Sequence, residues 1–264
     1  MRERIPVVVQ GRRTRRSRAA RALWTGAELA VTLGVVLLLL VVHQLWWTNR
    51  QAQRAAHDQV DRLERQWEAR TAAPAAPRRP GDDGSAEQAA RGGPPSGASG
   101  ASGRRAAGRD PAPPRNLAYA VLRIPRIGLT APVAEGVGKA AVLNQGYVGH
   151  YPHSARPGER GNVALAGHRN THGEPFRRLD RLRTGDTVLI DTAAARYTYV
   201  VRRTLARTTP GDGTVLAAVP YSSVHPAARF TAPGAYLTLT TCTPEYTSTY
   251  RLVVWGVLRS TQSR

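Results

Sequence analysis

Several residue types are nearly absent from this sequence. Among its 264 residues there are one cysteine, one methionine and two phenylalanines. The single cysteine, Cys242, excludes an intramolecular disulfide framework and a cysteine-rich zinc module. Lys139 is the one lysine, so arginine supplies the other 37 of 38 basic residues. A hydrophobic content of 41% is too high for a wholly disordered chain and too low for a protein with many membrane spans.

The basic charge is divided unevenly along the chain. Residues 1–23 carry a net charge of +7, and residues 24–47 carry −1. Residues 48–114 carry +3 and residues 115–264 carry +11, which completes the total of +20. A strongly basic balance suggests nucleic acid or an anionic surface as a partner. Because the excess falls in separate blocks, it does not define one nucleic-acid-binding face.

An apolar stretch fills residues 24–47. With its flanks it approaches the ~20 residues that a membrane-spanning helix needs. Trp24 lies at one end and Trp46 and Trp47 at the other, as is typical of membrane interfaces. Arginines cluster in residues 1–23, so we predict that this tail is cytoplasmic. The rest of the chain is then outside the cell, held by a single-pass anchor in the cell membrane.

Two alternatives compete with an uncleaved anchor. A cleaved signal peptide needs small residues after its apolar core, whereas His43, Gln44 and bulky apolar residues follow here. A buried helix of a soluble domain is the second alternative. The missing cleavage site and the terminal tryptophans favour the anchor.

Two segments separate this stretch from the remaining chain. Residues 48–70 are expected to form a juxtamembrane helix, because Ala56, Val60, Leu63 and Trp67 fall on one helical face. The membrane helix either continues outward here or pairs as a short coiled coil. Of the 44 residues in 71–114, 32 are Ala, Gly, Pro or Ser, so we expect a disordered linker. Such a linker would act as a tether that holds a domain away from the membrane.

Residues 115–264 are expected to form one globular domain. The domain contains strand-like runs with short helical candidates at 139–143 and 174–182. Many strands with few helices indicate a β-barrel or a sandwich. The expected strands are 119–124, 128–133, 162–166, 187–191, 197–203, 235–241 and 250–258.

Cys242 closes one of these strands, in the run YLTLTTC. A lone cysteine is often an inert buried side chain. Here, however, it precedes the turn residues Pro244 and Glu245, and an unpaired thiol outside the cell is a liability unless it has a use. We therefore interpret Cys242 as a candidate nucleophile, which needs a nearby base or cation to favour the thiolate.

His168 and Arg251 are the candidate partners of this cysteine. His168 closes another strand, in the run NVALAGH, where partial burial can tune its pKa. His172 lies four residues further on, but a loop around Gly173 argues against a metal pair, and we expect no metal site. Arg251 begins the strand after Cys242, so antiparallel pairing would place the two side by side, where Arg251 could stabilise an oxyanion.

Three ordered motifs together resemble the sortase family of cysteine transpeptidases. They are AGHRNTHG around His168, TLTTC ending at Cys242 and TYRLVVWG around Arg251. The run LRIPRIGL resembles the family's first barrel strand, and residues 149–176 are similar to the class E subgroup of Actinobacteria. The resemblance covers roughly residues 117–260. It implies a mainly β fold, an eight-stranded sortase-type barrel with short helices, preceded here by one transmembrane helix and a disordered linker.

The resemblance also implies roles for individual residues. His168 would be the general acid/base, Cys242 the nucleophile and Arg251 the group that stabilises the oxyanion or holds substrate. Tyr151, in GHYPHSA, matches a tyrosine associated with signals that begin Leu-Ala, and Thr241 lies in the nucleophile motif, so both are implied to bind substrate. We expect His168 and Cys242 to form a reverse-protonation pair. The resemblance implies no cofactor, and the scattered acidic residues of the domain give no calcium-binding cluster. Class C sortases often carry an Asp-Pro-aromatic lid motif before the barrel. Here Ala112 follows Asp110-Pro111, so we expect no lid.

Sortase substrates are secreted proteins with a C-terminal sorting signal. The resemblance implies cleavage of an LAXTG-like or LPXTG-like signal between Thr and Gly through a thioester. The protein is then transferred to an amine on a peptidoglycan precursor or another cell-wall acceptor. This transfer would anchor proteins to the cell surface. We expect no nucleic acid among the partners.

Two other functions compete with transpeptidation for this domain. An extracytoplasmic cysteine protease differs from a transpeptidase only in the nucleophile that resolves the thioester. Papain-like enzymes place the cysteine before the histidine, and L,D-transpeptidases carry a Ser-His-Gly-Cys context that is absent here. A non-catalytic module that binds anionic wall polymer would use the net charge of +11 and leave Cys242 inert.

Overall fold

The computed structural model describes residues 18–72 and 114–264. Most of the expected basic tail, at 1–23, and of the expected linker, at 71–114, lies outside the described residues. The chain divides into two units, Met1–Arg50 and Gln51–Arg264. Helix α1 (Arg18–Ala72) contributes residues to both units. Its bounds include the helix expected at 48–70.

The part of α1 in the first unit is strongly apolar. Many of its large side chains, including Leu29, Leu38 and Val42, are more than half exposed. Its threonine hydroxyls bond within the helix: Thr32 Oγ1 donates to the carbonyl oxygen of Glu28 at 2.7 Å. By length and composition, α1 is able to cross a membrane.

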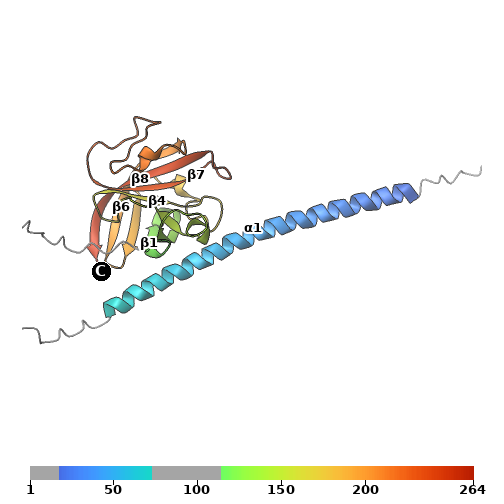
Figure 1. Ribbon diagram of the computed structural model, residues 1–264, viewed down its shortest axis with the longest axis horizontal. Coiled ribbons are helices and arrows are strands. Elements are labelled where there is room, and N and C mark those ends of the chain that lie inside the picture. Colours follow the sequence, from blue (N-terminus) through green and yellow to red (C-terminus); the bar gives the residue numbers. More distant parts are fainter. Residues whose placement is uncertain (1–17, 73–113) are drawn as a thin grey trace, which may run out of the picture. The chain divides into compact units, whose positions relative to one another are not determined.

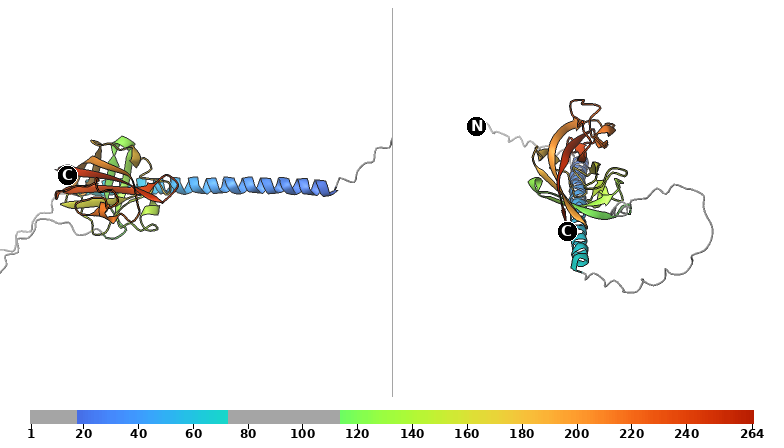
Figure 2. Two further views of the ribbon diagram at one scale, coloured as in Figure 1. Left: turned by 90° about the horizontal axis from the view of Figure 1, so that it is seen from above. Right: turned by 90° about the vertical axis from the view of Figure 1, so that its left-hand side faces the viewer.

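Eight strands of the second unit close into a β-barrel, as expected from the sequence. Going around the barrel, the strand order is β1-β2-β3-β4-β7-β8-β6-β5. Strands β7 and β8 are antiparallel neighbours that lie side by side in Figures 1 and 2. The strands are β1 (Ala118–Ile124), β2 (Leu129–Glu135), β3 (Val148–His150), β4 (Gly161–Ala166), β5 (Thr187–Thr192), β6 (Ala195–Thr208), β7 (Ala235–Thr243) and β8 (Tyr250–Ser263).

Alternate side chains of each strand fill the barrel, because successive residues of a strand point to opposite faces. The interior core holds Leu237 and Leu239 of β7, with Leu252 and Val254 of β8. The residues between them, such as Val253 and Trp255, belong to a second cluster on the outer face. This alternation decides which residues of β4, β7 and β8 can face a substrate outside the barrel.

The connections contain less helix than the sequence suggests. The candidate at 139–143 becomes turns that lead into a 3-10 turn, η2 (Leu143–Gln145), and the candidate at 174–182 contains only η3 (Leu179–Arg181). The spacing of Phe176, Leu179 and Leu182 reflects burial in the barrel core, which a turn satisfies as well as a helix does. The remaining short turns are η1 (Pro125–Ile127) and η4 (Gly213–Leu216).

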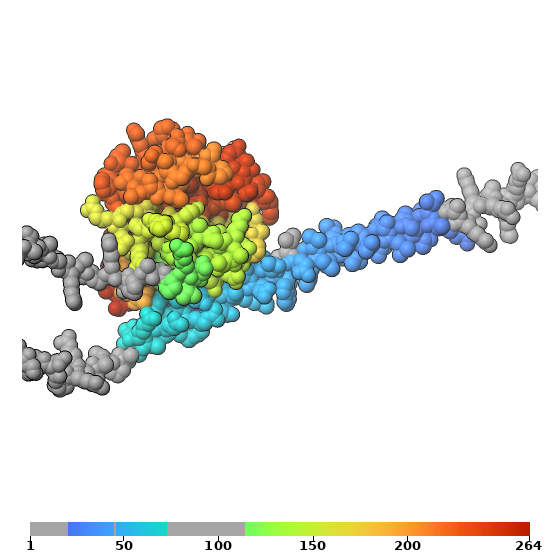
Figure 3. All heavy atoms as spheres, in the orientation of Figure 1, coloured from blue at the N-terminus to red at the C-terminus, as the bar shows by residue number. Residues whose placement is uncertain are grey.

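The long connection between β6 and β7 covers the outer face of β8. Val215 packs against Val253 and Trp255, and Phe230 joins the edge of this cluster. The carbonyl oxygen of Val215 accepts hydrogen bonds from Thr238 Oγ1 at 3.1 Å and from Trp255 Nε1 at 3.2 Å. In Figure 3 the orange residues of this connection gather at one end of the barrel. The connection begins after Thr208, the last residue of β6, which pairs with Arg251 of β8.

Candidate active site

Cys242 lies at the end of the central strand of a three-stranded group, β4-β7-β8. Leu237 and Leu239 point into the barrel, so Cys242, which has the opposite parity, faces outward. Its side chain is partly buried. Because Cys242 lies at the paired end of β7, its backbone is held rigidly. Its partial exposure leaves the thiol accessible to a substrate outside the barrel.

His168 leaves β4 at the same end as Cys242 leaves β7. The two strands are parallel, with Ala166 opposite Thr240, and each candidate residue lies two positions further on. The pairing continues past β4, because the Gly167 amide donates to the carbonyl oxygen of Thr240 at 3.2 Å. Two residues far apart in the sequence are thereby brought to adjoining strand ends.

Arg251 lies on the other side of Cys242. The antiparallel register of β7 and β8 places these two residues directly opposite each other, which confirms the pairing expected from the sequence. Arg251 Nη1 donates to the carbonyl oxygens of Ser248 at 2.9 Å and Tyr250 at 3.0 Å. These bonds hold the guanidinium against the β7–β8 loop.

The surroundings of His168 favour its neutral form. Burial lowers the pKa of His168, and the nearby charges of His172 and Lys139 lower it further. The rings of His168 and His172 are 5.4 Å apart between centroids. His168 Nε2 lies 2.9 Å from Asn144 Oδ1, an oxygen that can only accept, so Nε2 carries a proton and Nδ1 is left as the basic nitrogen.

Tyr151 and Thr241 both lie close to this site, in different ways. Tyr151 shares a side-chain hydrogen bond with Thr240 and lies within electrostatic range of Cys242 and Arg251, while burial raises the pKa of Tyr151. Thr241 is 3% exposed, and its hydroxyl donates to the carbonyl oxygen of Gly167 at 2.8 Å. Substrate binding by either residue stays a prediction. The hydrogen bond of the Thr241 hydroxyl connects β7 to the segment that holds His168.

Two residues at the site were missed by the sequence analysis. Asn144 is the hydrogen-bond partner of His168, and its position in η2 carries no sequence signal. Arg169 follows His168 and is 7% exposed. Its Nη1 donates to Thr243 Oγ1 at 3.0 Å and to the carbonyl oxygen of Cys242 at 3.5 Å, and its Nη2 pairs with Asp180 at 3.2 Å. Because the sequence contains 37 arginines, nothing in it distinguishes Arg169 from an exposed surface arginine.

Together these residues form a constellation suited to cysteine chemistry. A thiol, an imidazole and a guanidinium come from adjoining ends of β7, β4 and β8. A nucleophile, a proton carrier and a cation are the groups that acyl transfer requires. Within residues 18–72 and 114–264, no group of three or more His, Cys, Asp or Glu side chains could hold a metal ion.

Comparison with known proteins agrees with this fold. The sortase domain model matches residues 122–259. The chain is 35% identical over 261 residues to Sortase SrtE1 of Streptomyces coelicolor, covering 94% of this chain and 61% of that protein. It is 33% identical over 260 residues to Sortase SrtE2 of the same organism, covering 96% of this chain and 88% of that protein.

A solved structure extends the likeness to three dimensions. The crystal structure of Sortase E1 from Streptomyces coelicolor, with a tripeptide in its active site, superposes with a TM-score of 0.53 at 42% identity. The match covers 56% of this chain and 92% of that one. A closed eight-stranded barrel with this strand order is the architecture of a sortase. The chain belongs to the sortase family, and its similar relatives include class E sortases.

Proposed function

We propose that this protein is a membrane-anchored transpeptidase of class E. In this proposal it cleaves a C-terminal sorting signal of the LAXTG or LPXTG type between Thr and Gly and joins the new carboxyl end to a cell-wall amine. The observation that carries the proposal is the placement of Cys242 between the His168 strand end and Arg251, in a chain of the sortase family. Because the chain spans 61% of the length of SrtE1, activity and substrates are inferred from this site and not taken from that relative.

The first step forms a thioester. Cys242 gives its proton to His168, whose lowered pKa keeps the imidazole neutral and able to accept it. The thiolate sulfur bonds to the carbonyl carbon of the signal's Thr, and the carbonyl electrons move onto oxygen. When the C–N bond to Gly breaks, the imidazolium returns the proton to the leaving amine. The fraction of thiolate with imidazolium is small, as in a reverse-protonation pair.

Arg251 would stabilise the negative charge of the tetrahedral intermediate. It carries a permanent positive charge and lies opposite Cys242 in the register of β7 and β8, on the side of β7 away from β4. A guanidinium offers several fixed N–H donors, which suits an oxyanion that exists only during the reaction. Tyr151, near Thr240, would contact the signal peptide.

The second step needs an amine acceptor and access to the membrane. His168 removes a proton from the amine, which attacks the thioester and releases Cys242. The apolar part of α1 would anchor the enzyme where secreted substrates and wall precursors meet. The arginines before it favour a cytoplasmic N-terminus and an extracellular barrel.

An assay with an added amine tests this function. The full chain is incubated with LAXTG-type or LPXTG-type peptides, with and without an amine acceptor, and products are identified by mass spectrometry. We expect ligated product with the wild type and none with Cys242→Ala, whose folding is checked by circular dichroism. Cleavage without ligation at saturating amine would indicate a protease instead, and ligation by Cys242→Ala would refute the nucleophile.

A further inference from the structure

The second unit contains more than the barrel, because the last part of α1 packs on the outside of β1. Val60, Leu63 and Trp67 are each 5% exposed and form a cluster with Val121 of β1. Val121 is 0% exposed, although its neighbours Ala120 and Leu122 point into the barrel. An outward-facing residue of a barrel strand is this deeply buried only when another element covers it.

Charged groups surround this apolar contact. Arg123 of β1 pairs with Glu64 of α1 and also with Asp191 of β5, at 3.1 Å. Arg264, near the end of the chain, lies 4.8 Å above the ring of Trp67 and 3.7 Å from Asp191. Hydrogen bonds from Arg196 and Arg123 hold the pKa of Asp191 below its usual value although burial acts in the opposite direction. The contact therefore has an apolar centre and a paired ionic edge.

The start of this helical segment touches two loops of the barrel. A Cβ on Gly146 would lie 2.7 Å from the carbonyl oxygen of Ala52, and one on Gly173 would lie 3.6 Å from the amide nitrogen of Gln53. Both glycines have positive φ, +78° and +85°. Because any larger residue at Gly146 would collide with α1, the helix and these loops are in direct backbone contact.

These two loops carry the neighbours of His168. Gly146 directly follows η2, whose Asn144 bonds His168 Nε2 at 2.9 Å. Gly173 directly follows His172, whose ring lies 5.4 Å from the ring of His168. The helix thus rests on both segments that define the surroundings of the candidate acid/base.

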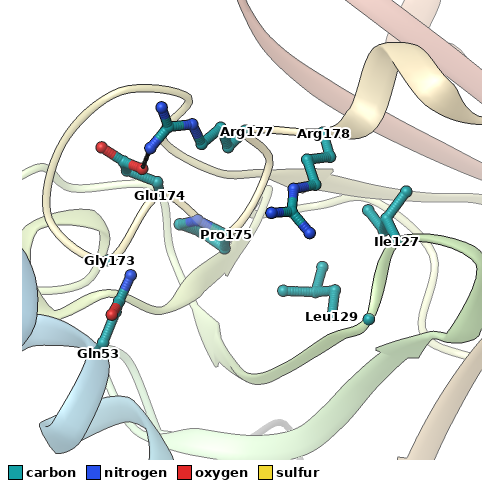
Figure 4. Close-up of a pocket in the computed structure, with 9 residues that line it drawn as sticks. Gln53, Ile127, Leu129, Gly173, Glu174, Pro175, Arg177 and Arg178 are labelled. Carbon is teal, nitrogen blue, oxygen red and sulfur yellow. Dashed lines mark hydrogen bonds and ion pairs between the residues drawn. The ribbon is translucent and has the colours of Figure 1, made fainter.

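The same segment also forms a wall of a cavity of about 260 Å³. Figure 4 shows Gln53 reaching from α1 toward the loop that holds Glu174 and Arg177, which form an ion pair at 2.7 Å. This loop begins at Gly173 and ends before η3. Residues of both the helix and this loop line the cavity, so separating the two would open it to solvent.

We propose that residues 51–72 of α1 are a docking partner built into the chain, which holds the barrel on the helix and supports the loops that carry Asn144 and His172. The catalytic unit extends from residue 51, although the segments that form it are separated in the sequence. The catalytic part of this inference rests on the proposed function, whereas the docking part does not.

Cleavage of the chain outside the docked elements tests the docking. A protease site is placed within residues 73–113 of the full chain, which carries an affinity tag at its N-terminus and is held in detergent or nanodiscs. After complete cleavage we expect the barrel fragment to remain with the tagged α1 fragment. Leu63→Asp puts a charge into the apolar centre and should release the barrel, while the matched control Gln66→Asp, at an exposed position of the same helix, should retain it. Release of the unaltered barrel, or equal release by both variants, would overturn the docking.

Hydrogen exchange on the unaltered chain makes the test independent of how any variant folds. Burial of three large apolar side chains should slow exchange of the amides in 56–67 by about 100-fold or more relative to an exposed helix. Exchange at the rate of an exposed helix would contradict the proposal even if every variant folds poorly.

Kinetics with a soluble sorting peptide test the support of the site. Leu63→Asp should lower kcat by roughly tenfold and leave KM within about twofold, because the helix supports His168 and does not contact peptide. Gln66→Asp should behave as the wild type. If Leu63→Asp releases the barrel but leaves kcat unchanged, the catalytic part of the proposal is wrong. A wild type that retains its barrel but has no activity would instead contradict the proposed function.

Discussion

At the scale of single residues, Arg169 joins the two strand ends that hold the candidate catalytic pair. It follows His168 in the chain and bonds to Thr243 and the main chain of Cys242. Its Nε is buried and has no hydrogen-bond partner among the described residues. A buried cation in this place costs desolvation, which its bonds to β7 and to Asp180 offset. We therefore regard Arg169 as a positioning residue.

Replacing Arg169 should weaken both stability and turnover. For Arg169→Met we expect a loss of about 2 kcal/mol in the free energy of unfolding, because charged hydrogen bonds to β7 disappear. We also expect a fall in kcat larger than the change in KM, since the Cys242 backbone loses its tie to the His168 segment. Arg181→Met, at an exposed arginine, is the control. Thermal unfolding and peptide kinetics measure both effects, and an unchanged kcat would show that Arg169 is structural alone.

His172 should tune His168 through charge. The proximity of His172 contributes to the lowered pKa of His168, after the larger effect of burial. Removing the electrostatic effect of His172 favours the protonated ring of His168, so His172→Asn should raise the pKa of His168 toward 6.5, which it should not reach because burial still lowers it. The imidazole proton shifts of His168, followed by NMR against pH, give the value. A pKa that stays the same or falls in the variant would contradict this electrostatic account.

At the scale of elements, the β6–β7 connection is organised by Asp212. This carboxylate is 3% exposed and accepts hydrogen bonds from Thr208 at 2.6 Å, Ser222 at 2.5 Å and Thr214 at 2.7 Å. Burial acts to raise its pKa, but the bonds from Ser222, Thr208 and Thr214 outweigh burial and lower it to about 2. The carboxylate thus links the end of β6 to the middle of the connection.

The acid stability of the protein should reflect this carboxylate. Because the folded pKa lies below the unfolded value of 3.8, the stabilisation is full above the unfolded pKa and is lost as pH falls through about 2. Asp212→Asn should cost about 2 kcal/mol at pH 7 and much less near pH 2. Denaturant unfolding at several pH values measures this difference. A deficit of equal size at both ends of the range would exclude the linkage.

The elements also show what sequence reasoning could reach. Strand-like runs in the sequence located seven of the eight strands, and the Cys242–Arg251 pairing followed from a short loop between antiparallel strands. Strand β3 has three residues, Val148–His150, which is too short for any periodicity. The parallel pairing of β4 with β7 joins residues about 74 positions apart, such as Ala166 and Thr240, and no local pattern encodes it. For the same reason Asn144 and Arg169 became visible only in the folded chain.

At the scale of the whole molecule, the chain combines an apolar anchor candidate with a barrel unit that begins at residue 51. The arginine-rich start of the chain predicts that the N-terminus stays in the cytoplasm. In intact cells or right-side-out vesicles, added protease should degrade the barrel and spare an N-terminal epitope. Lysed vesicles, in which both are degraded, are the control. An epitope that is cleaved while the barrel is spared would reverse the orientation.

The central claim, that Cys242 is the nucleophile of a sortase-type acyl transfer, is tested most directly by trapping the intermediate. The full chain is mixed with a peptide bearing an LAXTG-type or LPXTG-type signal, without amine, quenched in acid and analysed by intact-protein and peptide mass spectrometry. The account predicts an added mass equal to the peptide up to and including its Thr, located on Cys242 and released by an amine or by thiol exchange. Cleavage of the signal with no adduct on Cys242, or an adduct on another residue, would contradict it.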